Sequence, residues 1–240
     1  MCSKEWREYL GGRGGARFSG GLRSLALILI FGALMPFSLG AKWVMSPLAL
    51  LFDGVYFPLI LTLTVVADSF AGERERHTLE TLLASRLSDR AILLGKVAAI
   101  TSYGWLFGLC AALVGVVVAN IRALQLAPFF YTPWIAGGIA VFGLLSSALM
   151  ASAGCLVSLR APTMRQAQQT LSGAFAVLLF GGLIGLQLVP AADRAWLIGA
   201  LAGVGVELTL AVAAIGLLVV DGVLVTAALA RFRRDRLILD

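Results

Sequence analysis

Residues 97–119 read VAAITSYGWLFGLCAALVGVVVA, a stretch of 23 residues without a charged side chain. A helix needs about 20 mostly apolar residues to cross the hydrocarbon core of a bilayer. The apolar side chains are continuous along this stretch and do not alternate with polar ones. That pattern is typical of a membrane-spanning helix and not of a barrel strand. Residues 97–119 therefore predict a transmembrane helix.

Five further stretches have the same character and a similar length. They are residues 22–40, 48–67, 134–157, 171–189 and 204–230. Across the chain, 60% of the residues are hydrophobic and 13% are charged, whereas a soluble domain carries about a quarter charged residues. The sequence predicts an all-α membrane protein, with six spans in a single transmembrane domain over residues 1–240.

The apolar stretch that ends in the last predicted span is too long for one helix. Residues 196–230 contain only two acidic residues, of which Asp221 is the deeper. We expect a short re-entrant helix near residues 196–201 that dips into the outer face of the membrane. Gly203 and Gly205 would then break the chain before the final span.

The basic residues predict the orientation in the membrane. Sixteen of the 19 lie in the amino-terminal segment, in the loops after the second and fourth spans, and in the carboxyl-terminal segment. The other three are Lys42, Arg122 and Arg194. Since Lys and Arg are enriched on the cytoplasmic side of membrane proteins, both termini are expected in the cytoplasm. The same scattered distribution gives no indication of nucleic-acid binding.

Residues 68–90 form the only long charged stretch between two predicted spans. At helical spacing, charged side chains share one face and leucines share the opposite face. The charged face holds Glu73, Arg76, His77 and Glu80, and the apolar face holds Leu79, Leu82, Leu83 and Leu87. We expect this amphipathic helix to start after Gly72, and Ser88 and Asp89 to cap the next span. The helix could lie on the lipid surface or dock a cytoplasmic partner.

The sequence AGERERHTLETLLAS at residues 71–85, followed by LLGK at residues 93–96, resembles the signature of ABC-2 type transporter permeases. Residues 4–8 (KEWRE) resemble the interfacial amino-terminal helix of that family, and residues 231–236 (RFRRDR) resemble its basic tail. Many members have proline where this chain has Arg86. The family also places a short re-entrant helix before its last span.

The resemblance implies a permease subunit of an ATP-driven transporter, an exporter, in the inner membrane of a prokaryotic cell. Separate ATPase subunits, which bind ATP and Mg, would associate from the cytoplasm, and a second permease copy or a paralogue would complete a dimer. The loop between spans two and three would be the coupling helix. Its residues expected to face or brace the ATPase are Glu73, Arg74, Arg76, Thr78 and Glu80.

The chain lacks the residues that ATP hydrolysis requires. A P-loop reads Gly-x-x-x-x-Gly-Lys-Ser/Thr, but Gly95 and Lys96 are followed by Val97, and Arg90 stands at the first glycine position. The single histidine, His77, lies in the charged loop, and no cysteine or histidine has metal-ligand spacing. We therefore expect no cofactor, no metal and no catalysis in this chain. One alternative is a membrane anchor whose ATPase performs mechanical or assembly work. A second, from a different functional class, is an intramembrane enzyme.

Three acidic residues fall at membrane depth. Asp53 and Glu207 lie near the predicted outer ends of their spans and are expected at the interface. Asp221 lies ten residues before Arg231, about 15 Å inside the cytoplasmic end of the last span. It could line a substrate path or an interface, or pair with a polar group on a neighbouring span.

Aromatic and small residues complete the pattern. The aromatic side chains expected as a belt at the outer boundary are Trp43, Trp134, Trp196 and Tyr131. The glycines expected to permit ordinary close packing of helices are Gly137, Gly138, Gly143, Gly154, Gly181, Gly182 and Gly185.

Overall fold

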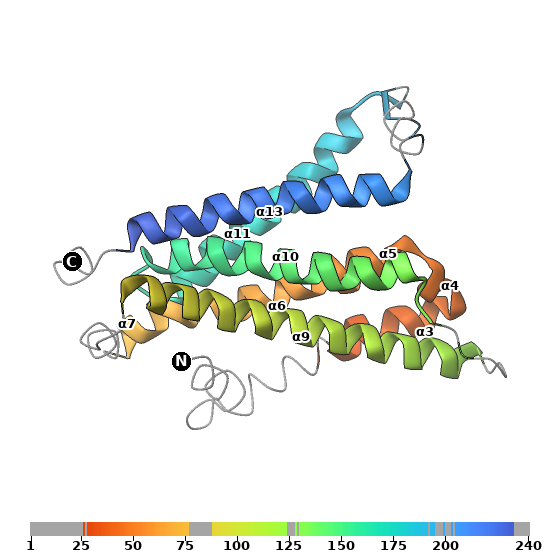
Figure 1. Cartoon of the computed structure of the whole chain (residues 1–240), viewed down its shortest axis with the longest axis horizontal. Helices are drawn as coiled ribbons and strands as arrows, with labels where there is room; N and C mark the ends of the chain where they lie inside the picture. Colours follow the sequence, from red (N-terminus) through yellow and green to blue (C-terminus); the bar gives the residue numbers. More distant parts are fainter. Residues whose placement is uncertain are drawn as a thin grey trace.

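A computed structural model shows an elongated bundle of helices (Figure 1). The structure describes residues 28–76, 88–123, 130–191 and 205–232, together with a few single positions between these ranges. Within them every regular element is a helix, which confirms the predicted all-α class. The short helices at the start are η2 (Ile30–Leu34), α3 (Met35–Leu39) and α4 (Ala41–Met45).

The second predicted span is one long helix assembled from five consecutive segments. They are α5 (Pro47–Ala49), the π-helical η3 (Leu50–Tyr56), α6 (Phe57–Val66), the π-helical η4 (Asp68–Gly72) and α7 (Glu73–Glu75). The other long helices are α9 (Asp89–Ala123), α10 (Pro133–Ser158), α11 (Met164–Leu188) and α13 (Val206–Arg231). We refer to Pro47–Glu75 as the second long helix.

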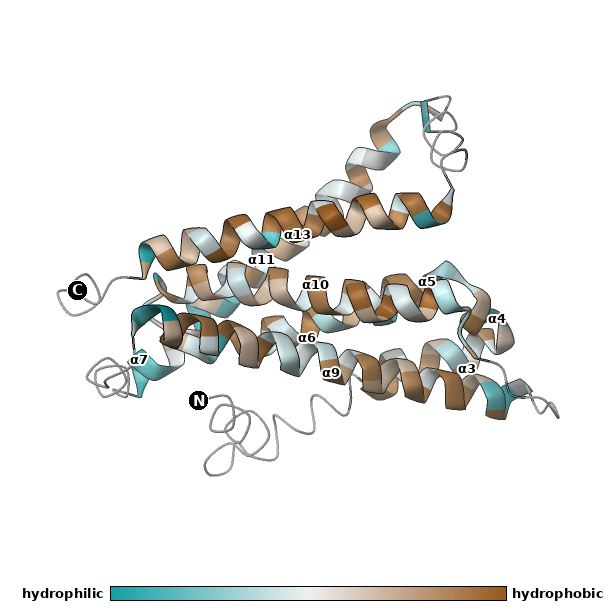
Figure 2. Ribbon diagram, in the orientation of Figure 1, coloured by the Kyte–Doolittle hydropathy of each residue, from teal (hydrophilic) through white to brown (hydrophobic). Residues whose placement is uncertain are grey.

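Four of these helices are long and apolar enough to cross a membrane. They are Pro47–Glu75, Asp89–Arg122, Pro133–Ser158 and Val206–Arg231. They coincide with the second, third, fourth and sixth predicted spans. Their middles are hydrophobic and their ends hydrophilic (Figure 2), as expected for helices that cross a bilayer.

The first and fifth predicted spans also fall on helices where the structure describes them. Residues 30–39 form η2 and α3, and α11 covers nearly all of residues 171–189. The crossing of a membrane by these two, and hence a total of six spans, stays a prediction. The proposed re-entrant helix near residues 196–201 falls almost wholly outside the described residues. Gly205, with a φ of +86°, directly precedes α13, so the predicted break is present there.

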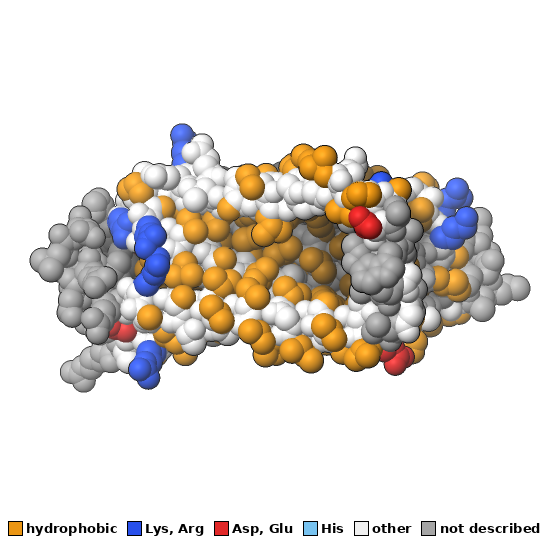
Figure 3. All heavy atoms as spheres, turned by 90° about the horizontal axis from the view of Figure 1, so that it is seen from above, with side chains coloured by type: hydrophobic (Ala, Val, Ile, Leu, Met, Phe, Trp, Pro, Cys, Tyr) orange, Lys and Arg blue, Asp and Glu red, His pale blue; other side chains and the backbone are white. Residues whose placement is uncertain are grey.

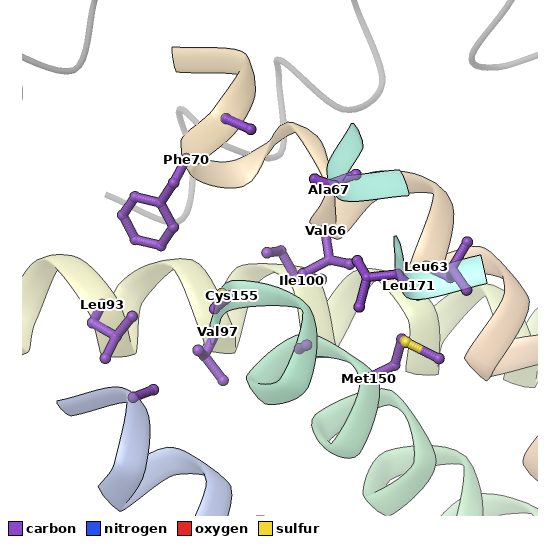
Figure 4. Packing of buried hydrophobic residues seen from close by; sticks show 14 of the residues in the cluster. Leu63, Val66, Ala67, Phe70, Leu93, Val97, Ile100, Met150, Cys155 and Leu171 are labelled. Atoms are coloured by element: carbon purple, nitrogen blue, oxygen red, sulfur yellow. The ribbon is translucent and has the colours of Figure 1, made fainter. Parts of the chain in front are cut away.

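The second long helix, α9 and α10 pack together as the core of the bundle (Figure 1). Small residues bring their backbones close. A Cβ at Gly54 would lie 3.0 Å from the Cα of Ile139, and one at Gly154 would overlap the Val66 side chain. Buried apolar residues fill the predicted cytoplasmic half between these helices (Figure 4). The predicted packing role is confirmed for Gly154, and for Gly138, which lies against Leu50.

The outer parts of α11 and α13 carry a large exposed apolar surface. Val177, Leu178 and Leu188 on α11 are 74–79% exposed. In the part of the chain that the structure describes, a Cβ at Gly181 or Gly182 would meet nothing within 4 Å. Apolar side chains cover the middle of the face formed by α11 and α13, while Lys and Arg lie at its two ends (Figure 3). Such a surface suits lipid and not water.

Candidate coupling site

The second long helix continues past the predicted membrane boundary. We expected a separate helix to begin after Gly72, and that prediction is wrong. Gly72 has helical angles (φ −67°, ψ −35°) inside an uninterrupted helix that runs to Glu75. A Cβ at Gly72 would overlap the carboxylate of Asp68, so any other residue there would require the Asp68 side chain to move. The first residues of the expected coupling helix are therefore a rigid extension of a membrane-spanning helix.

Glu73 points into the bundle and pairs with Lys96 of α9. The Lys96 Nζ donates to the Glu73 Oε1 at 2.9 Å and to the Ser69 carbonyl at 2.8 Å. It also lies 5.1 Å from the centre of the Phe70 ring, a cation–π geometry. The side chains of Lys96 and Glu73 are only 1% and 16% exposed. Removing one partner of a buried ion pair costs about 3–5 kcal/mol, because the other charge stays buried.

Arg74 and Glu75 reach the ends of two other helices. The Arg74 guanidinium donates to the carbonyls of Leu159 (3.1 Å) and Ala161 (2.8 Å), directly after α10. The Glu75 carboxylate accepts from the backbone N–H of Met164 at 2.8 Å, the first residue of α11. A cation at a helix carboxyl end and an anion at an amino end both match the helix dipole. Residues 73–75 thus hold α9, α10 and α11 at once.

Arg76 stays on the surface. It donates to both carboxylate oxygens of Asp68, at 2.7 and 2.9 Å, and its side chain is 55% exposed. An exposed pair of this kind contributes little to stability, and the guanidinium remains accessible. Of the other predicted coupling residues, Thr78 and Glu80 lie outside the described residues.

Ser158, at the end of α10, binds the backbone of η4. Its Oγ accepts from the N–H groups of Phe70 (3.1 Å) and Ala71 (2.9 Å) and donates to the Ala67 carbonyl at 3.3 Å. The side chain is fully buried. A π-helical turn disturbs the regular hydrogen-bond ladder, and this hydroxyl satisfies the donors there. On the other side, the Phe70 ring packs on Phe232 at 5.4 Å, which brings the end of α13 to the same segment.

The predicted outer end of the bundle contains a second buried polar cluster. We expected Asp53 at the interface, and Trp43 and Tyr131 in a belt, but Asp53 and Trp43 are fully buried. The Tyr131 hydroxyl lies 3.2 Å from both Asp53 Oδ2 and the Ala112 carbonyl, and its single proton can be donated to either. Trp43 Nε1 donates to that same hydroxyl at 3.2 Å. The interfacial prediction fails for Asp53 and Trp43, which lie inside the protein and both contact the half-buried Tyr131 hydroxyl.

Asp221 is buried at membrane depth. It is 7% exposed, and along α13 only Asp221 and Ala228 are buried. Among the described residues, neither of its carboxylate oxygens has a hydrogen-bond partner. The carboxylate thus faces the bundle and not lipid. Glu207, in the first turn of α13, is exposed as expected.

Comparison with known proteins identifies the family. Residues 50–202 match the family described as ABC-2 family transporter protein. The chain belongs to the ABC-2 transporter family. It is also similar to the ABC transporter permease protein NatB of Bacillus subtilis (strain 168), with 26% identity over 137 residues. Those residues are 52% of this chain and 35% of NatB, so the chain matches about a third of its relative's length.

Membership of the ABC-2 family agrees with the resemblance of residues 71–96 to its signature. ABC-2 permeases are membrane subunits that are not themselves catalytic, in agreement with the failed P-loop match. Within the described ranges, no three His, Cys, Asp or Glu side chains are placed to hold a metal ion. Lys96 and Ser158 were missed as site residues. Lys96 resembled a topology marker, and a serine in an apolar run carries no distinctive signal.

Proposed function

We propose that this chain is the membrane-spanning permease subunit of an ATP-driven transporter. Residues 73–76 and the segment that follows would receive a separate ATPase subunit from the cytoplasm. A second permease copy or a paralogue would complete the assembly, with six spans per chain. The proposed direction is export, and it rests on the resemblance of residues 71–96 to the family signature.

The contacts of Glu73, Arg74 and Glu75 carry this proposal. A force applied at the end of the second long helix would act on α9 through Lys96, on α10 through two carbonyls and on α11 through its first N–H group. Four helices would then respond as one unit. This is the requirement for converting nucleotide-driven closure of an ATPase into movement of membrane helices.

The same geometry separates docking residues from internal ones. Glu73 and Arg74 are engaged inside the bundle, whereas the Arg76 side chain is 55% exposed. We therefore assign ATPase docking to Arg76 and bracing to Glu73 and Arg74. For Thr78 and Glu80, which lie outside the described residues, the docking role rests on the resemblance to the family signature alone. Asp221 would face the translocation path or a subunit interface.

The test is affinity purification of the tagged chain from membranes in mild detergent, followed by identification of bound proteins. We expect a soluble ATPase with its own P-loop. The double variant Arg76→Glu with Glu80→Lys should lose it, while Lys42→Glu, an exposed charge change at the opposite end, should retain it. If the wild-type chain purified without an ATPase in several detergents, the permease proposal would be wrong.

A further inference from the structure

The π-helical segment η4 is held from two sides by buried polar groups. Lys96 of α9 binds the Ser69 carbonyl and Glu73, on either side of Phe70. Ser158 of α10 binds the Phe70 and Ala71 N–H groups. These contacts are directional, whereas apolar packing lets helices slide past one another. The segment just before the coupling residues is therefore attached to both neighbours by hydrogen bonds.

Lys96 lies near the start of α9, the longest uninterrupted helix among the described residues. α9 runs without interruption from Asp89 to Ala123. At about 1.5 Å per residue, the part after Lys96 is about 40 Å long. A displacement of the Lys96 side chain by Glu73 would be transmitted along this rod to the opposite end of the bundle.

At that opposite end the same two helices are joined again. Asp53 of the second long helix and the Ala112 carbonyl of α9 both lie 3.2 Å from the Tyr131 hydroxyl, whose single proton can be donated to either. Both ends of the helix pair thus have a buried polar connection, one through Lys96 and one through Tyr131. A shift imposed at one connection must be accommodated at the other, because the helices between them are close-packed.

We propose that Lys96 is a positioning residue that makes α9 move with the coupling segment, with η4 as the joint. Lys96 would not touch the ATPase or a substrate. It would act through Glu73, by keeping the start of α9 fixed to the end of the second long helix while the ATPase opens and closes. This inference rests on the proposed function, and it adds the residue that carries the movement to the outer half of the membrane.

The test follows movement at the outer end of α9 in the complex with its co-purified ATPase. Spin labels at Ile121→Cys and Val206→Cys occupy exposed positions on α9 and on α13. The reference label is on α13 because the second long helix is expected to move together with α9. Cys2 and Cys110 are replaced by serine, and Cys155 is buried. The distance between the labels is measured in lipid nanodiscs with and without ATP and Mg, together with the amount of bound ATPase.

We expect the label distance to change on addition of ATP in the otherwise wild-type chain. Lys96→Met should keep the ATPase bound and lose this change, because the apolar stem still packs but the link to Glu73 is gone. Lys96→Arg, which retains a charged donor, should restore it. The double variant Lys96→Met with Glu73→Gln leaves no buried charge and should also lose the change, which provides a second test if the single variant does not fold.

The outcomes distinguish this inference from the function on which it rests. If either neutralised variant folds, retains the ATPase and still shows the ATP-dependent distance change, Lys96 is not a positioning residue and the permease proposal stands. If the labelled wild-type complex binds its ATPase and shows no ATP-dependent change, the inference is likewise overturned. If no ATPase co-purifies with the wild-type chain, the proposed function and the inference fail together.

Discussion

Individual side chains hold together the end of the bundle that contains the candidate coupling site. Ser158 alone satisfies two backbone donors of η4 from a neighbouring helix, and Gly72 leaves room for the Asp68 carboxylate that Arg76 holds. Neither contact is repeated elsewhere in this region of the described chain. Each can therefore be removed by a small substitution whose consequence follows from the geometry.

Ser158→Ala should destabilise the protein by about 1–3 kcal/mol, because the buried N–H groups of Phe70 and Ala71 lose the hydroxyl to which they donate. The loss is measured as a lower unfolding temperature in detergent and as faster hydrogen exchange of those two amides. Ser152→Ala is the matched control on the same helix, since the buried Ser152 hydroxyl donates only to the Leu149 carbonyl of its own helix. Equal effects of the two substitutions would contradict the role given to Ser158.

Gly72→Ala should also destabilise the protein, by about 1–3 kcal/mol, because the new methyl group must displace the Asp68 carboxylate. Gly137→Ala provides the comparison within a helix, at a position where a Cβ meets nothing within 4 Å. There alanine should be neutral or stabilising by up to about 1 kcal/mol. The unfolding temperatures of the two variants, measured in the same detergent, test the expected decrease for Gly72→Ala and the expected unchanged or higher value for Gly137→Ala. A Gly72→Ala variant as stable as the wild type would show that Asp68 has space to move.

At the scale of elements, the long helices were predictable and their connections were not. Continuous apolar stretches predicted the four candidate spans within a few residues, except that the second continues to Glu75 and α9 begins at Asp89. Charged residues beyond a span look like a loop, although here they extend the helix because Glu73 and Arg74 find partners on other helices. Ser88 was correctly predicted as a cap, and its Oγ accepts from the Ala91 N–H group.

The buried polar clusters could not be predicted because their members come from distant parts of the chain. Asp53 and Tyr131 are 78 positions apart, and Glu73 and Lys96 are 23 apart. An isolated acidic or basic residue near the end of an apolar stretch has the pattern of an interfacial residue. Only the packing of the elements decides whether a counterpart lies beside it.

The Tyr131 hydroxyl connects Trp43 of α4, Asp53 of η3 and the Ala112 carbonyl of α9. Loss of this hydroxyl should therefore lower the stability of the protein. Tyr131→Phe removes the donor to Asp53 and the acceptor for Trp43, and should lower stability by about 1–3 kcal/mol. Tyr56→Phe serves as the control, because the half-buried Tyr56 ring would keep its contacts with Phe52 and Phe175. Unfolding temperatures in detergent, followed by Trp fluorescence, distinguish the two. If both substitutions behaved alike, the Tyr131 hydroxyl would contribute nothing to holding the outer end.

In the whole molecule, the distribution of basic residues agrees with the position of the candidate coupling site. Figure 1 shows α7, the start of α9 and the end of α10 at one end of the bundle, and α4 and the end of α9 at the other. Arg74, Arg90 and Arg160 lie in or just after the first group of segments, and Lys42 and Arg122 lie in the second. Hydrophobic residues predominate along the helices between the two ends (Figure 2). The end with more basic residues is the one that holds the coupling site, so the predicted orientation and the proposed docking face are consistent. The reverse orientation would put the coupling site out of reach of any cytoplasmic ATPase.

The orientation can be measured with single cysteines at opposite ends. Lys42→Cys and Arg160→Cys are both exposed, in a chain whose Cys2 and Cys110 are replaced by serine. A maleimide that does not cross membranes should label Lys42→Cys in intact cells, and Arg160→Cys only after permeabilisation, because basic loops stay in the cytoplasm. Equal labelling of both after permeabilisation is the control for reactivity. Labelling of Arg160→Cys from outside would place the coupling site on the wrong side of the membrane and remove the basis for the permease proposal.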